Sequence, residues 1–177
     1  MTLANWITSS RFVLAPFIFW QLTGGASQGV VWALILLLIA GLTDVADGWA
    51  ARSRNEVSEL GKILDPLADK LVTGGVLLAL TVKWGLPVWM VLVYILKEMI
   101  QVGAGAVLVK RMKLVIPANR FGKNATFAFF LGFGLFFVHK VIGQAVLAIA
   151  IGMSIYALYT YYLAYLKLKE SKDNKIN

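Results

Sequence analysis

Four aspartates at fixed spacing stand inside hydrophobic sequence in the first half of the chain. They are Asp44, Asp47, Asp65 and Asp69. Carboxylates are costly inside a bilayer, so acids in sequence this hydrophobic indicate a functional site. Carboxylate oxygens are also the ligands that hard cations such as Mg²⁺ and Mn²⁺ prefer. The four side chains therefore predict a site for one or two divalent ions.

Helical spacing places the acids of each pair side by side. The first two are three residues apart and the last two are four apart, so each pair lies on one face of a helix. A short polar turn joins the two segments, so we expect antiparallel packing that brings the pairs together. Gly48, Ala51 and Gly61 share these faces and leave space for a bulky ligand. Arg52 extends the first face and is suited to binding a phosphate or a sugar hydroxyl.

Electrostatics also favours a metal site. Four neighbouring carboxylates repel one another in a medium of low dielectric constant, and bound divalent ions remove that conflict. Two ions would suit phosphoryl transfer, in which paired metals hold the attacking and leaving oxygens. The structural alternative pairs the acids with Arg52, Lys62 and Lys70 in helix packing. We favour the functional interpretation, because clusters of intramembrane acids without a function are rare.

The elements that must position these residues are membrane helices. The chain has 177 residues, of which 59% are hydrophobic, far more than in a soluble domain. Apolar stretches of about 17 to 25 residues, the length that crosses a bilayer, recur along it. We expect an all-α integral membrane protein with six transmembrane helices in one domain, residues 1–177. The expected spans are residues 3–23, 29–51, 59–82, 87–109, 121–138 and 142–166.

The basic residues predict the orientation of these spans. Most of the 17 lysines and arginines fall in the N-terminus, the second and fourth connectors and the C-terminal tail. Only Lys83 and Lys140 fall in connectors on the other side. The positive-inside rule then places both termini and the acids, at the ends of the second and third helices, on the cytosolic side. The absence of cysteine excludes disulfides and thiolate metal sites, and no removable signal peptide is expected.

The string from Asp44 to Asp69 resembles the signature of the CDP-alcohol phosphatidyltransferase family. That signature is Asp-x-x-Asp-Gly-x-x-Ala-Arg, eight residues, then Gly-x-x-x-Asp-x-x-x-Asp, and each position is present here. The six-span layout is similar as well. The resemblance implies a metal-dependent phosphotransferase of phospholipid biosynthesis, which uses Mg²⁺ or Mn²⁺ and displaces CMP from CDP-diacylglycerol with an alcohol.

The same resemblance implies roles for individual residues. Asp44, Asp47 and Asp65 would be metal ligands, and Asp69 would contact metal and act as the general base on the incoming hydroxyl. The residues that would bind the CDP-lipid are Asn5, Thr8, Gly48, Ala51, Arg52 and Gly61. A homodimer in a bacterial plasma membrane, with its active site facing the cytoplasm, is also implied. No nucleic-acid partner is expected.

Candidate acceptor-binding residues lie later in the chain. Lys97 and Glu98 fall within the fourth span, and each needs a partner or a water-filled cavity. As neighbours in sequence, they are not expected to face each other. Lys123 and Thr126 share a helix face just after Arg120, and these cations suit an acceptor that carries phosphate. The alternative is that the two cations of this group are ordinary cytoplasmic anchors.

Within the family, the chain looks most like the bacterial phosphatidylglycerophosphate synthases, whose acceptor is sn-glycerol 3-phosphate. The similarity rests on Asn5-x-x-Thr8-x-x-Arg11 at the start and on Gly122-Lys123-x-x-Thr126. Those enzymes usually have arginine before the acid of the fourth span, where this chain has Lys97. The pattern also resembles cardiolipin synthases, which use phosphatidylglycerol, and an inositol phosphate is a third candidate acceptor.

Two functions other than catalysis also agree with the sequence. A divalent-cation transporter also needs intramembrane acids, but usually places them near the bilayer midplane on broken helices or paired repeats. The sequence shows no repeat. A non-catalytic lipid-binding scaffold would use the polybasic face, and it predicts that Asp69→Asn leaves function untouched.

Overall fold

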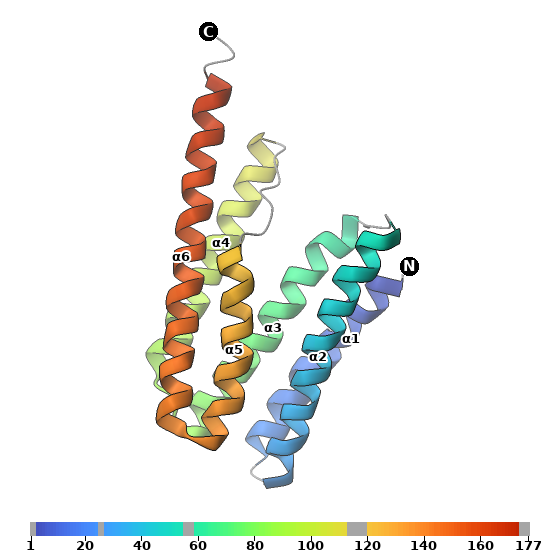
Figure 1. Ribbon diagram of the computed structural model, residues 1–177, viewed down its shortest axis with the longest axis vertical. Helices are drawn as coiled ribbons and strands as arrows, with labels where there is room; N and C mark the ends of the chain where they lie inside the picture. Colours follow the sequence, from blue (N-terminus) through green and yellow to red (C-terminus); the bar gives the residue numbers. More distant parts are fainter. Residues whose placement is uncertain (1–2, 25–26, 55–58, 113–119, 174–177) are drawn as a thin grey trace. The chain divides into compact units, whose positions relative to one another are not determined.

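The chain folds into six α-helices in the computed structural model, which describes residues 3–24, 27–54, 59–112 and 120–173 (Figure 1). Side chains are described for residues 10–24, 28–42, 67–105 and 120–166. The helices are α1 (Leu3–Thr23), α2 (Ser27–Arg54), α3 (Glu59–Trp84), α4 (Val88–Met112), α5 (Arg120–Val138) and α6 (Lys140–Asp173). The expectation of an all-α protein is confirmed throughout the described chain.

Each expected span coincides with one of these helices. Among the described residues, three segments have the length and hydropathy to cross a membrane: Val88–Gly105, Arg120–Val138 and Lys140–Leu166, on α4, α5 and α6. A shorter apolar stretch, Gln28–Leu42, lies in α2. Three membrane helices are therefore supported. Spans on α1, α2 and α3 stay a prediction, as does the placement of the termini.

The first of two compact units, Met1–Val91, is built around α1. Within this unit α1 packs against both α2 and α3 (Figure 1). Its buried face is a stripe at helical spacing, formed by Arg11, Ala15, Ile18 and Leu22. A Cβ added at Gly75 of α3 would lie 4.0 Å from the carbonyl oxygen of Ala15. This is an ordinary van der Waals distance, so the backbones of α1 and α3 are neighbours here without a contact that requires glycine.

A side-chain hydrogen bond also ties the far ends of α1 and α3 together. The indole Nε1 of Trp84 donates to the carbonyl oxygen of Leu22 at 2.9 Å. Carbonyls in the last turn of a helix have no partner within the helix, so this bond satisfies one of them. The bond opposes sliding of α1 along α3 and so fixes the axial register of the two helices.

The second unit, Leu92–Asn177, contains α5 and α6 packed side by side (Figure 1). The two helices meet at a very tight contact, where a Cβ added at Gly143 would lie 2.2 Å from Cα of Phe136. On α4, Tyr94 packs edge-on against Phe129 of α5, with ring centroids 5.6 Å apart. A tight glycine contact thus joins α5 to α6, and an edge-on aromatic contact joins α4 to α5.

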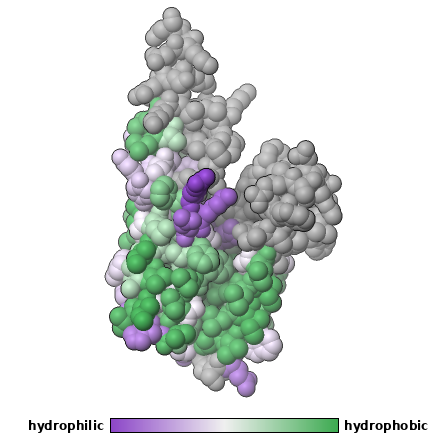
Figure 2. Space-filling view, in the orientation of Figure 1, coloured by the Kyte–Doolittle hydropathy of each residue, from purple (hydrophilic) through white to green (hydrophobic). Residues whose placement is uncertain are grey.

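Hydrophobic side chains are exposed along helices of both units, among them Leu38, Leu92 and Ile149. Figure 2 shows such side chains over much of the visible surface, with hydrophilic side chains gathered where α5 begins. Exposed apolar surface of this extent marks contact with lipid or with another protein. Together with the three candidate spans, it indicates a membrane protein.

Candidate functional site

The aspartate motif lies on continuous helix. Helix α2 runs without interruption to Arg54, and α3 runs without interruption from Glu59. The predicted helical spacing of both acid pairs is therefore confirmed at the level of the backbone. The side chains of nine predicted site residues lie outside those described: Asn5, Thr8, Asp44, Asp47, Gly48, Ala51, Arg52, Gly61 and Asp65. Their roles and the meeting of the two acid pairs stay predictions.

Asp69 is the motif aspartate whose side chain the structure describes. Its Oδ1 atom accepts a hydrogen bond from Nη1 of Arg11, and the two side chains form an ion pair. The Arg11 side chain is 1% exposed, whereas that of Asp69 is 43% exposed. The arrangement is a buried cation beneath an accessible carboxylate.

Packing of α1 against α3 produces this pairing. Arg11 begins the buried stripe of α1, and Ala68, next to Asp69, is itself fully buried. The guanidinium therefore lies where the helices meet, and a charge in such a place needs a counter-charge. Sequence reasoning used Arg11 for topology and for the resemblance at the start of the chain, and did not predict its pairing with Asp69. The signal that could have placed it here is the spacing of Asn5, Thr8 and Arg11, which puts all three on one face of a helix.

The described carboxylate fits a hard divalent cation. An ionised carboxylate has about four acceptor positions, so the bond from Arg11 does not use up the coordinating capacity of Asp69. Its exposure leaves room for an ion to approach. Among the side chains that the structure describes, no three potential ligands come together, and the other three motif aspartates are not among them. Metal binding stays a prediction.

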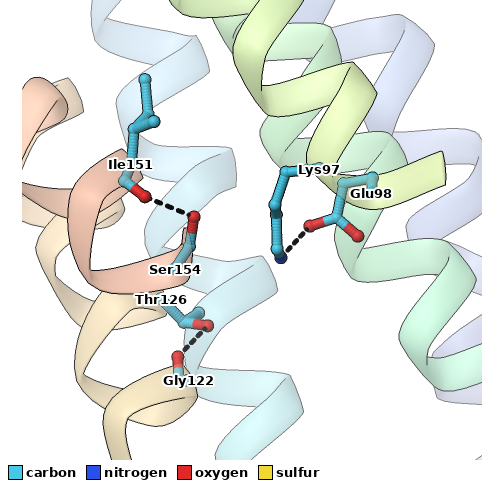
Figure 3. Close-up of polar contacts among 6 residues, drawn as sticks. All are labelled: Lys97, Glu98, Gly122, Thr126, Ile151 and Ser154. Atoms are coloured by element: carbon cyan, nitrogen blue, oxygen red, sulfur yellow. Dashed lines mark hydrogen bonds and ion pairs between the residues drawn. The ribbon is translucent and has the colours of Figure 1, made fainter. Parts of the chain in front are cut away.

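Lys97 and Glu98 form an ion pair in the second unit, contrary to the expectation that they would not face each other. Nζ of Lys97 lies 2.7 Å from Oε1 of Glu98, and the side chains are 11% and 15% exposed (Figure 3). The expectation considered only the angle between neighbouring positions on the helix. The flexible four-carbon stem of lysine bridges that angle. The pair meets the need for a partner that a charge in a membrane span has.

Two acceptor candidates lie at the same level of the α4–α5 contact. Helices α4 and α5 run in opposite directions (Figure 1), and Tyr94 contacts Phe129. One turn further along α4 is the Lys97–Glu98 pair, and one turn back along α5 is Thr126. Figure 3 shows these residues across from one another. Lys97 and Thr126 thus lie across from each other within this unit, and their role in binding an acceptor stays a prediction.

The start of α5 carries the remaining candidates. Arg120 and Lys123 are exposed there. The hydroxyl of Thr126 donates to the carbonyl oxygen of Gly122 at 3.2 Å (Figure 3), which leaves the hydroxyl oxygen as an acceptor. The helix places Lys123 and Thr126 on one face, as their spacing predicted. Exposed cations at this position are available to an anionic ligand.

A comparison with known families decides the affiliation of the chain. The model of one family, described as CDP-alcohol phosphatidyltransferase, matches residues 1–156. The chain belongs to the CDP-alcohol phosphatidyltransferase family. The matched region contains all four aspartates, Arg11 and every acceptor candidate. The resemblance drawn from the motif is thereby confirmed, and the chain is a member of a transferase family.

Among the curated relatives of this CDP-alcohol phosphatidyltransferase are proteins with two kinds of name. CDP-diacylglycerol–glycerol-3-phosphate 3-phosphatidyltransferase of Bacillus subtilis is 38% identical over 132 residues, which cover 73% of this chain and 68% of the relative. The protein of the same name from Rickettsia felis is 30% identical over 172 residues, covering 92% of this chain and 94% of the relative. Cardiolipin synthase (CMP-forming) of Streptomyces coelicolor is 33% identical over 138 residues, covering 76% and 64%. The chain thus spans less than two thirds of the Streptomyces protein.

Proposed function

We propose that this chain transfers the phosphatidyl group of CDP-diacylglycerol to sn-glycerol 3-phosphate and releases CMP. The observation that carries the proposal is the family match over residues 1–156, which takes in the whole aspartate motif. The choice of acceptor is supported by the Rickettsia relative, which aligns over nearly the full length of both chains and is named for glycerol 3-phosphate.

The chemistry of the second unit supports a phosphorylated acceptor. Arg120 and Lys123 are exposed cations at the start of α5, suited to charge-assisted bonds with a phosphate. Lys97 is less exposed than these two cations. We assign Lys97 and Thr126 to the same acceptor. The second candidate acceptor is phosphatidylglycerol, which the name of the Streptomyces relative favours. It too carries a phosphate, so the basic residues alone do not separate the two.

In the proposed reaction the acceptor hydroxyl oxygen attacks the phosphorus that carries the diacylglycerol. A bond forms between these two atoms while the bond from that phosphorus to the oxygen of CMP breaks. CMP leaves, and the hydroxyl proton passes to the carboxylate of Asp69 as general base. The exposure of this carboxylate supports the role, because an acceptor must reach it.

The other motif residues are assigned to binding. We assign Asp44, Asp47, Asp65 and Asp69 to one or two Mg²⁺ or Mn²⁺ ions, which when bound neutralise the pyrophosphate and stabilise CMP as it leaves. The residues assigned to the CDP-lipid are Asn5, Thr8, Gly48, Ala51, Arg52 and Gly61. Six membrane helices with both termini in the cytoplasm would put this site at the inner leaflet of a bacterial plasma membrane, and the protein would act as a homodimer.

An acceptor panel tests the proposal. Purified protein in lipid vesicles receives CDP-diacylglycerol, Mg²⁺ and one of three acceptors: glycerol 3-phosphate, phosphatidylglycerol or an inositol phosphate. CMP release and product mass are measured. We expect CMP and phosphatidylglycerophosphate with glycerol 3-phosphate. Release of CMP with cardiolipin as the product would identify phosphatidylglycerol as the acceptor. Mg²⁺ flux into the vesicles without CMP release would indicate a transporter and not an enzyme.

A further inference from the structure

Arg11 is a charged side chain among the largest fully buried side chains of the protein. The rest of its stripe on α1 is apolar: Ala15, Ile18 and Leu22. Burying a charge costs free energy unless it is paired and hydrogen-bonded. Burial of the arginine charge at this position therefore costs free energy, and its ion pair with Asp69 offsets that cost.

The two partners of this pair differ in what they can reach. At 1% exposure, Arg11 has no surface on which to bind a phosphate or an acceptor directly. Asp69, in contrast, is open on one side. The carboxylate of Asp69 is thus a route by which the buried Arg11 can act on a bound substrate.

The helix pair that carries the two side chains is joined by two side-chain hydrogen bonds, Arg11–Asp69 and Trp84–Leu22. The backbones of Ala15 and Gly75 are neighbours between these bonds. Both bonds oppose sliding or rotation of α1 against α3. The guanidinium is consequently a fixed reference point beneath Asp69.

We propose that Arg11 is a positioning residue, whose buried guanidinium fixes the direction in which Asp69 presents its carboxylate to the acceptor hydroxyl. The inference rests on the proposed function, from which the role of Asp69 comes. Loss of this bond removes one constraint on the side-chain conformer of a half-exposed aspartate. Since a misplacement of about 1 Å at a reacting group costs roughly 100-fold in rate, such freedom would slow proton transfer.

Kinetics of single variants test the first half of the inference. We expect Arg11→Met to lower kcat about 100-fold, with KM for CDP-diacylglycerol changed less than about threefold, because orientation and not binding is lost. Arg11→Lys keeps the charge and should recover about tenfold of that loss. Ile18→Ala is the matched control, since it removes buried volume from the same stripe two turns away and does not touch Asp69. It should lower the melting temperature but leave kcat within about threefold.

A second measurement does not depend on turnover. The melting temperatures of Arg11→Met, Asp69→Ala and the double variant are compared with that of the wild type, and we expect the double variant to melt above Asp69→Ala. If Ile18→Ala lowers kcat as much as Arg11→Met does, the role of Arg11 is packing and the inference is overturned. Additive melting shifts would overturn it as well. A wild type that releases no CMP would instead defeat the proposed function, while the melting comparison would still report on the pair.

Discussion

Because Arg11 is buried and Asp69 is partly exposed, we expect the two single substitutions to lower the free energy of unfolding by different amounts. Asp69→Ala leaves a guanidinium, 1% exposed, without this counter-charge. Breaking a buried ion pair in this way costs about 3 to 5 kcal/mol, and we take the lower end, about 3 kcal/mol, because water reaches the Asp69 side. Arg11→Met removes the buried charge itself and keeps most of the side-chain volume. The carboxylate left behind is 43% exposed and hydrated, so we expect a loss of about 1 kcal/mol.

The double variant removes both charges and should cost about 1 kcal/mol or less, because apolar replacement of a buried pair is often neutral. The coupling free energy is then about 3 kcal/mol. All six tryptophans of the chain fall within the first unit, so their fluorescence during unfolding in mixed micelles reports on that unit. Effects that add to within about 0.5 kcal/mol, or an Arg11→Met variant as unstable as Asp69→Ala, would refute the reasoning.

Further predictions concern packing, the acceptor and the metal. Gly143→Ala should destabilise the α5–α6 pair by about 1 to 3 kcal/mol, because the new Cβ would meet the backbone of Phe136; Gly152→Ala, where nothing lies within 4 Å, is the control in thermal unfolding. Lys123→Gln should raise KM for glycerol 3-phosphate about tenfold through loss of a charge-assisted bond, with KM for CDP-diacylglycerol unchanged in steady-state assays; an unchanged acceptor KM would make this lysine an anchor. Chelation should abolish CMP release, and Mg²⁺ at about 100 times its Kd should stabilise the protein by about 2.7 kcal/mol in thermal unfolding; the absence of any Mg²⁺-dependent shift would contradict a built cation site.

Local features were predictable from the sequence, and contacts between distant segments were not. Helix positions follow from hydrophobic length, so all six helices agree with the expected spans. The spacing of Lys123 and Thr126 gave their shared face correctly. The Arg11–Asp69 pair joins residues 58 positions apart, and it depends on the axial register of α1 against α3, which periodicity does not contain. The Lys97–Glu98 pair was missed for another reason, since face rules ignore how far a long side chain can bend back.

The Lys97–Glu98 pair bears on how α4 enters the membrane during synthesis. A single lysine or aspartate at the centre of an inserting helix costs about 2.5 to 3.5 kcal/mol. Because these two opposite charges are adjacent in sequence and bonded to each other, the helix carries its own neutralising group when it leaves the translocon. We therefore expect α4 to enter lipid more readily than it would with either charge alone.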